Sequence, residues 1–111
     1  DNGITAALGS DSPVIEADPM IGLYGALTRA DKCSGIVAGK DQRIGIMDAI
    51  RMYTYNGAYA SLEEKIKGSI EPGKLADLVI LSGNILDTPV EELKSLKADM
   101  TVIDGQIVYE R

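Results

Sequence analysis

The chain has 111 residues, 11 basic and 17 acidic side chains, a formal net charge of −6, and no histidine. A hydrophobic fraction of 45% with 25% charged residues is typical of one folded domain and excludes wholesale disorder. The acidic balance argues against nucleic acid or an anionic membrane surface as a partner, because both favour clustered Lys and Arg. Without histidine, this chain alone cannot build a Ser-His-Asp triad or a histidine-rich zinc site.

Cys33 is the single cysteine, so the chain forms no internal disulfide, and this favours a reducing cytoplasm. A nucleophilic Cys33 would need an activating base, and no imidazole is present to supply one. We expect a small, partly buried hydrophobic side chain instead. No apolar run approaches the roughly 20 residues of a membrane span, so we expect a cytoplasmic chain without a membrane partner.

The first predicted element is a strand over residues 4–8, which are almost continuously apolar and are followed by turn residues. Such continuous apolarity over a short length indicates a strand buried on both faces, as parallel strands are. In α/β folds the chemistry takes place where such strands end. Ser10 and Asp11 follow this strand and are therefore candidate functional residues.

Two helices are predicted next. Asp18 followed by Pro19 indicates an N-cap and a first-turn proline, which open a helix that continues to Leu27. Residues 31–41 contain two glycines and indicate a loop. The second helix has apolar positions at helical spacing, and these are Ile46, Ala49, Ile50 and Tyr53.

Two further local signals follow the second helix. Asn56-Gly57 is expected to interrupt or reshape it, because both residues tolerate a left-handed backbone. Ser61 and Glu64 have the spacing of a capping box, which predicts another short helical turn that ends at Gly68. The mixed charges of residues 63–67 are expected to form a solvated helix end with ion pairs.

The C-terminal part has a β pattern. Residues 71–73 (Glu-Pro-Gly) predict a turn, and residues 78–81 predict a strand. Residues 89–96 suggest a short helix with Val90, Leu93 and Leu96 facing inward. Residues 101–103 and 106–109 predict a hairpin around a type I′ turn at Asp104-Gly105.

These elements divide the chain into a buried strand with helices (1–68) and a small antiparallel β unit (69–111). One strand cannot pair both of its edges with so few partners, and the C-terminal sheet has an apolar face that needs cover. Each unpaired buried backbone group costs about 1–3 kcal/mol. We therefore expect either another copy of the chain or the rest of a larger protein to cover these elements.

Five stretches carry a family resemblance when they are taken in this order: GSDSPV at 9–14, DPMIGLYGALTR at 18–29, QRI at 42–44 with AIRMYT at 49–54, NGAYA at 56–60, and KGSIEPGKLADLVIL at 67–81. The last stretch is the most specific, and Thr101-Val102 with Asp104-Gly105 closes the series. Together they resemble the metal-dependent amidohydrolase superfamily, specifically its amidohydrolase-3 branch. The resemblance covers nearly the whole chain but only the C-terminal end of the family's length.

The resemblance implies an α/β to α+β fold made of two parts. Residues 1–68 would supply the last strand of a TIM barrel and the helices that follow it. Residues 69–111 would supply part of a small composite β-sandwich to which both ends of the family's chain contribute. The missing N-terminal barrel portion is then the expected partner, with a small-molecule substrate.

The resemblance also implies an activity. The family's barrel carries one or two divalent metals, with zinc expected, and hydrolyses non-peptide C–N bonds such as amides or cyclic amides. Asp11 would contact the metal and take a proton from the attacking water, which suits a carboxylate beside a metal-bound hydroxide. The family's metal-binding histidines match nothing in this sequence. We therefore expect neither tight metal binding nor turnover from this chain alone.

Two alternatives stay open at this point. The chain could be a non-catalytic binding or self-associating module derived from such a domain, with its exposed strands buried in a homodimer. It could also be an unrelated small α+β protein. A phosphate-binding loop at residues 35–40 is disfavoured, because the spacing fails and Asp41 stands where Ser or Thr would hold magnesium.

Overall fold

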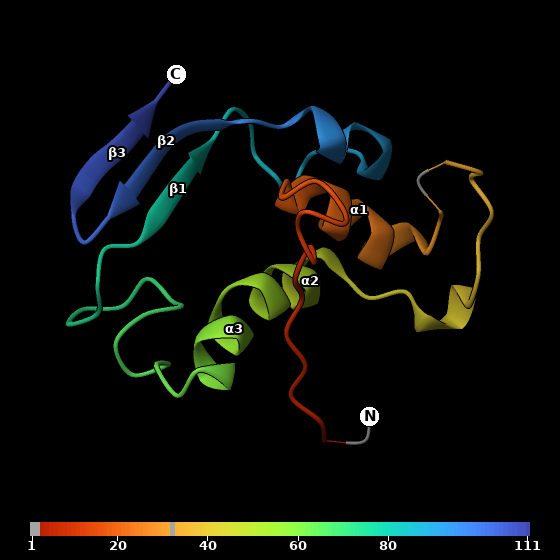
Figure 1. Ribbon diagram of the computed structural model, residues 1–111. Helices are drawn as coiled ribbons and strands as arrows, with labels where there is room; N and C mark the ends of the chain where they lie inside the picture. Colours follow the sequence, from red (N-terminus) through yellow and green to blue (C-terminus); the bar gives the residue numbers. More distant parts are fainter. Residues whose placement is uncertain (1–2, 32) are drawn as a thin grey trace.

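The computed structural model describes residues 3–31 and 33–111 (Figure 1). Along this part of the chain the elements are α1 (Pro19–Thr28), the 3-10 turn η1 (Lys40–Gln42), α2 (Ile46–Tyr53), α3 (Tyr55–Ala60), β1 (Leu78–Leu81), the 3-10 segment η2 (Val90–Ser95), β2 (Ala98–Ile103) and β3 (Gln106–Glu110). The helices precede the strands, so the fold is α+β. None of the helices in the described ranges is long and apolar enough to cross a bilayer.

The predicted first helix is confirmed as α1. The Asp18 carboxylate accepts a hydrogen bond from the Met20 backbone N–H at 2.9 Å, and Pro19 occupies the first turn, where its missing N–H costs nothing. The helix ends at Arg29, which has a left-handed backbone with φ 57° and donates its N–H to the Gly25 carbonyl. This local chemistry sets both ends of α1.

The second helix is confirmed as α2, and it is interrupted, but not at the predicted Asn56-Gly57. Asn56 and Gly57 both lie inside α3, and the break falls at Thr54, whose backbone has φ −116° and ψ −89°. Glycine tolerates a left-handed backbone but does not require it. The Asn56 side chain is instead engaged with a distant carbonyl, that of Ala6.

The capping box predicted at Ser61 is wrong, whereas a single helical turn is present, in which the Lys67 N–H donates to the Glu63 carbonyl at 3.0 Å just before Gly68. Ser61 caps the C-terminus of α3, and its hydroxyl donates to the Ala58 carbonyl at 3.1 Å and to the Glu63 carboxylate at 2.7 Å. Residues 61–69 form turns rather than a helix. The serine hydroxyl is used at the end of the preceding helix, so the capping box does not form.

The strand predicted over residues 4–8 is not formed. These residues run as an extended segment across the helices (Figure 1), and Ile4 is 80% exposed. A strand exists only where a second strand pairs with its backbone, and no strand of the described ranges lies beside this segment. Apolarity alone therefore does not produce a strand here.

The C-terminal sheet is confirmed, with the order β1-β2-β3 and both pairs antiparallel. Asp104 and Gly105 both have positive φ, 49° and 77°, as the predicted type I′ turn requires. The Asp77 carboxylate accepts from the Asp104 N–H at 2.9 Å, which ties this turn to the start of β1. The predicted turn at 71–73 is present, with Gly73 at φ 91°.

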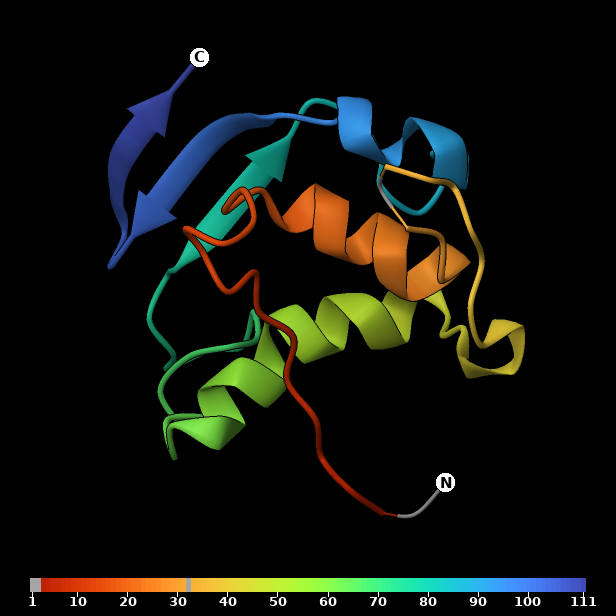
Figure 2. The ribbon, with the colours of Figure 1, turned by 45° about the vertical axis from the view of Figure 1, so that its right-hand side comes forward.

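The hydrophobic core lies between α1, α2 and η2. Its buried members are Met20, Leu23, Ala49, Leu93 and Leu96. The helix predicted over 89–96 is a 3-10 segment, and it brings Leu93 and Leu96 into this core as expected. Helices α1 and α2 run side by side in opposite directions (Figure 2).

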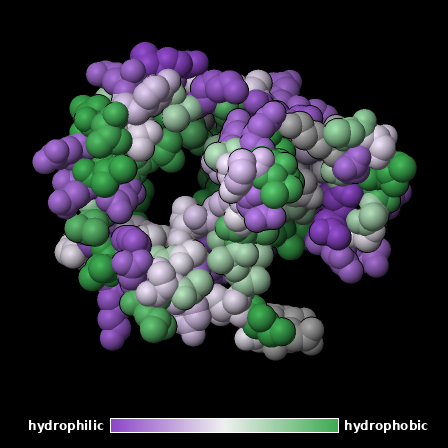
Figure 3. All heavy atoms as spheres, in the orientation of Figure 1, coloured by the Kyte–Doolittle hydropathy of each residue, from purple (hydrophilic) through white to green (hydrophobic). Residues whose placement is uncertain are grey.

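Much of the sheet stays outside this core. Every residue of β3 is exposed, including Ile107, Val108 and Tyr109. The radius of gyration is 14.7 Å, larger than the roughly 13 Å of a compact domain of this length. Figure 3 shows an open hollow between the sheet and the helices, with apolar residues on the sheet side. The apolar surface that the sequence predicted to need cover is therefore present.

Candidate functional site

The site begins at the tight turn that follows the extended segment. Asp11 has a left-handed backbone with φ 55°, which aspartate tolerates better than most residues. The turn closes through the Val14 N–H, which donates to the Asp11 carbonyl at 2.9 Å, and the Ser10 hydroxyl accepts from the Ser12 N–H at 3.3 Å. The Asp11 side chain is exposed. The turn thus presents this carboxylate at the surface.

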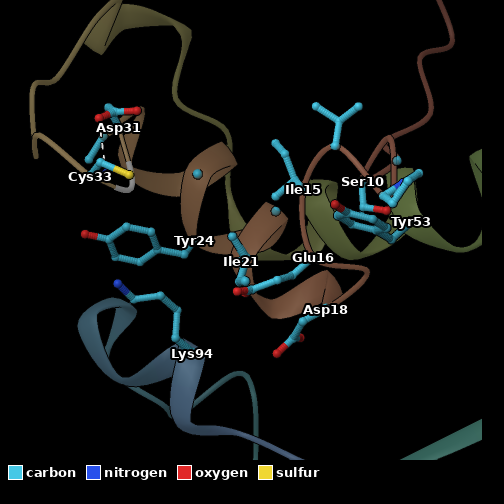
Figure 4. A pocket seen from close by; sticks show the side chains of 16 residues that line it. Ser10, Ile15, Glu16, Asp18, Ile21, Tyr24, Asp31, Cys33, Tyr53 and Lys94 are labelled. Atoms are coloured by element: carbon cyan, nitrogen blue, oxygen red, sulfur yellow. Dashed lines mark hydrogen bonds between the residues drawn. The ribbon is translucent and has the colours of Figure 1, made fainter.

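A groove of about 660 Å³ opens beside the turn (Figure 4). The turn, α1, the start of the loop after α1, the end of α2, and η2 all contribute to its walls. The residues that line it are Gly9, Ser10, Pro13, Val14, Ile15, Glu16, Asp18, Ile21, Gly22, Tyr24, Gly25, Ala30, Asp31, Cys33, Tyr53 and Lys94. Asp11 stands next to this groove rather than in its wall.

One end of the groove holds a cation over an aromatic ring. The Lys94 ammonium lies 4.1 Å from the centroid of the Tyr24 ring, a distance at which the two attract. Beyond Tyr24, the Asp31 carboxylate accepts from the backbone N–H of Cys33 and from the Ser34 N–H and hydroxyl. Cys33 is exposed, which corrects the expected partial burial, because it lies in the surface loop after α1 and outside the hydrophobic core.

The other end of the groove is formed by Tyr53. Figure 4 shows its ring beside Ser10, at the base of the turn that carries Asp11. Burial raises the pKa of the Tyr53 phenol above its usual value of 10.0. The raised pKa extends the range of alkaline pH over which the phenol stays protonated, and its hydroxyl lies against Gly22 of α1.

Carboxylates near the groove do not converge on one point. In residues 3–31 and 33–111, no three His, Cys, Asp or Glu side chains lie close enough together to hold a metal ion. A catalytic zinc needs about three protein ligands. The described donor set therefore does not fit a metal by itself, and the role of Asp11 as a metal ligand stays a prediction.

The other motifs singled out in the sequence have ordinary structural roles. Lys67 and Glu63 form the expected exposed ion pair, at 2.7 Å. Hydrogen bonds from Lys67 and then Ser61 lower the pKa of the Glu63 carboxyl. The segment 35–40 is a loop that leads into η1.

Two contacts at this site had no signal in the sequence. Asn56 donates to the Ala6 carbonyl across 50 positions of the chain, and Lys94 reaches Tyr24 from a different part of the fold. Neither pair belongs to a local motif. Only the packing of η2 and α3 against the N-terminal half brings them together.

Comparison with known proteins places this architecture in a family. A model of the Amidohydrolase family matches residues 1–109, and the chain therefore belongs to this family. The fold is similar to the crystal structure of an amidohydrolase from Thermotoga maritima MSB8, with a TM-score of 0.71 and 30% sequence identity over 98% of this chain and 24% of that one.

Two curated relatives show the same relationship. YtcJ of Bacillus subtilis, whose name assigns it to the amidohydrolases, is 35% identical over 98% of this chain and 21% of its own length. The N-substituted formamide deformylase of Arthrobacter pascens is also 35% identical, over 100% of this chain and 20% of its own length. The chain thus spans about a fifth of the relatives that it matches.

Proposed function

We propose that this chain is the C-terminal part of an amidohydrolase-like hydrolase that cleaves non-peptide C–N bonds, amides or cyclic amides, with a metal-activated water. The match to the Amidohydrolase family over residues 1–109 is the observation that carries the proposal. One relative is named for deformylating N-substituted formamides, which are amides. The substrate is accordingly a small molecule with an amide-type bond.

The uncovered elements support a place within a larger fold. Residues 4–8 are extended and largely exposed, as the last strand of a TIM barrel would be if its neighbouring strands were removed. The exposed apolar residues of β1 and β3 suit one part of a composite β-sandwich. Residues 1–68 therefore complete the barrel, residues 69–111 complete the sandwich, and the N-terminal barrel portion is the partner of both.

Asp11 is the proposed catalytic residue of this chain. A divalent metal, zinc by expectation, supplies a water of lowered pKa when the complete ligand set is present. Asp11 would be one of the residues that hold this metal in the complete protein, and its carboxylate would accept the proton of the attacking water and return it to the leaving nitrogen. The other ligands belong to the missing portion, so the isolated chain binds no metal tightly and is inactive. The lone, unpaired cysteine favours a cytoplasmic location.

The test is an Asp11→Asn substitution in the longer protein that contains this chain. Asparagine keeps the size of the side chain but cannot accept the proton, so we expect kcat for an N-substituted formamide to fall by about 10²–10⁴-fold. Asp87→Asn is the matched control, because that carboxylate accepts a hydrogen bond from Asn84 in the loop after β1 and does not line the groove. Turnover within twofold of the parent after Asp11→Asn would falsify the role, and stoichiometric zinc on the isolated chain would contradict its predicted lack of metal.

The second candidate is a self-associating module without catalysis. The exposed apolar side chains Ile107, Val108 and Tyr109 on β3 favour it, because an open strand edge can pair with a second copy. The gene sequence upstream of Asp1 distinguishes the two proposed functions. An open reading frame that continues upstream into a barrel with a His-x-His strand supports the hydrolase, whereas a start codon just before Asp1 with a stable dimer in solution supports the module.

A further inference from the structure

Two hydrogen bonds hold the extended segment that leads to Asp11. The Asn56 side-chain amide donates to the Ala6 carbonyl at 2.7 Å, and the Leu8 backbone N–H donates to the Met52 carbonyl at 3.1 Å. Both partners belong to the helical region around the α2–α3 junction. The segment that carries the proposed catalytic carboxylate is therefore attached to this junction.

The break at Thr54 makes both attachments available. A helix leaves its last four carbonyls without partners inside the helix, and Met52 is the penultimate residue of α2. Its carbonyl accepts the Leu8 N–H instead. The change of direction at Thr54 starts α3 at Tyr55 and places Asn56 in its first turn, within reach of Ala6. An unbroken helix would satisfy the Met52 carbonyl internally.

The spacing of the two hydrogen-bonded residues allows them to fix the orientation of the extended segment. Ala6 and Leu8 are two positions apart, and alternate residues of an extended chain direct their backbone groups to the same edge. Two bonds on one edge fix both the position and the rotation of the segment, whereas one bond would leave it free to pivot. Asp11 follows three residues after Leu8 and is the first residue of the closed turn described above.

We propose that Asn56 is a positioning residue for catalysis: its amide holds Ala6 and thereby sets where the Asp11 turn stands in the hydrolytic site. This inference rests on the proposed function. Asparagine suits the role because its amide donates a hydrogen bond, which an ionised aspartate of the same shape cannot do. A displacement of about 1 Å at a reacting group can reduce a rate by roughly 10²-fold.

The first test measures the attachment in the chain itself. Asn56→Asp removes the donor at constant size, and we expect hydrogen exchange at the Leu8 amide to accelerate at least tenfold (about 1.4 kcal/mol). Asn84→Asp is the matched control, because the Asn84 amide donates to Asp87 in a distant loop. Unchanged Leu8 exchange in Asn56→Asp, with Asn84→Asp also unchanged, would overturn the proposal.

The second test separates positioning from folding in the longer protein. We expect Asn56→Asp to lower kcat by about 10- to 100-fold while KM stays within threefold and the bound metal is retained. If that variant does not fold, Asn56→Ala removes the same donor without adding a charge, and the same fall in kcat is expected. An unaltered kcat in a folded variant would contradict the role of Asn56 in positioning Asp11.

The two proposals fail in different ways. If the parent protein turns over no amide-type substrate, the proposed function is wrong, and if Asp11→Asn leaves turnover intact, the catalytic role of Asp11 is wrong, whatever Asn56 does. If Asp11→Asn abolishes turnover but Asn56→Asp and Asn56→Ala leave kcat unchanged, the hydrolase function stands and the positioning role of Asn56 is wrong.

Discussion

The hydroxyl of Tyr53 occupies the space where residue 22 would carry a side chain. A Cβ atom added to Gly22 would overlap that hydroxyl oxygen and lie 2.8 Å from the ring carbon that bears it. This contact brings α2 against α1 directly beside the groove. The glycine therefore permits the close approach that gives the groove its wall at Tyr53.

Gly22→Ala is expected to lower the free energy of unfolding by about 1–3 kcal/mol, because the added methyl group forces the Tyr53 ring to move. Gly25→Ala in the same helix is the control. It has open space around it and should stabilise α1 by about 0.5–1 kcal/mol. Urea unfolding measures both. Tyr53→Phe removes the hydroxyl that the added methyl group meets, so Gly22→Ala should cost less free energy of unfolding in the Tyr53→Phe background than in the parent. Strictly additive effects in this double-mutant cycle would contradict the contact.

The raised pKa of Tyr53 predicts a loss of stability at alkaline pH. Because burial raises this pKa in the folded state, its contribution is fully present below the unfolded value of 10.0 and is lost as the pH rises through the folded pKa. We expect the melting temperature to fall less steeply above pH 10 in Tyr53→Phe than in the parent. Identical pH profiles for the two proteins would show that the phenol is not responsible.

Gly68 is expected to tolerate no side chain. It has φ +92°, and an added Cβ would lie 2.7 Å from the Ala58 Cβ in α3. Gly68→Ala should therefore destabilise the chain by about 1–3 kcal/mol. Gly57→Ala, within α3 and with open space around it, should instead stabilise the chain by roughly 0.5–1 kcal/mol. Thermal unfolding of the two variants tests this prediction. Equal changes in melting temperature for Gly68→Ala and Gly57→Ala would mean that only the loss of backbone entropy in the unfolded chain matters.

Leu93 is the largest fully buried side chain of the described residues, at 1% exposed. Leu93→Ala removes apolar contacts between η2 and the helices, and it should cost about 2–5 kcal/mol of stability. Leu86, in the same connection between β1 and β2, is 54% exposed, so Leu86→Ala should change stability by less than about 0.5 kcal/mol. Chemical denaturation of both variants tests whether η2 anchors the sheet to the helices. Similar losses of stability in Leu93→Ala and Leu86→Ala would contradict this anchoring role of η2.

Short-range chemistry made part of the candidate site predictable. The turn at Ser10 and Asp11 follows from polar and turn-forming residues after an apolar run, and these signals lie within a few positions of one another. The groove beside it was not predictable. Its walls come from α1, α2, η2 and the loop at Cys33, which meet only when the chain folds.

The sequence by itself determined the elements whose causes are local. Asp18 and Pro19 set the start of α1, Asp104 and Gly105 set the hairpin, and the ordered motifs indicated the family. The helix start and the hairpin each depend on backbone hydrogen bonds or conformational preferences within about four residues. Tertiary structure decided that residues 4–8 pair with no strand in the part of the chain that the structure describes, that the helix breaks at Thr54, and that the Asn56 side chain donates to the Ala6 carbonyl. These outcomes depend on which distant backbone groups find partners, and no local pattern records that.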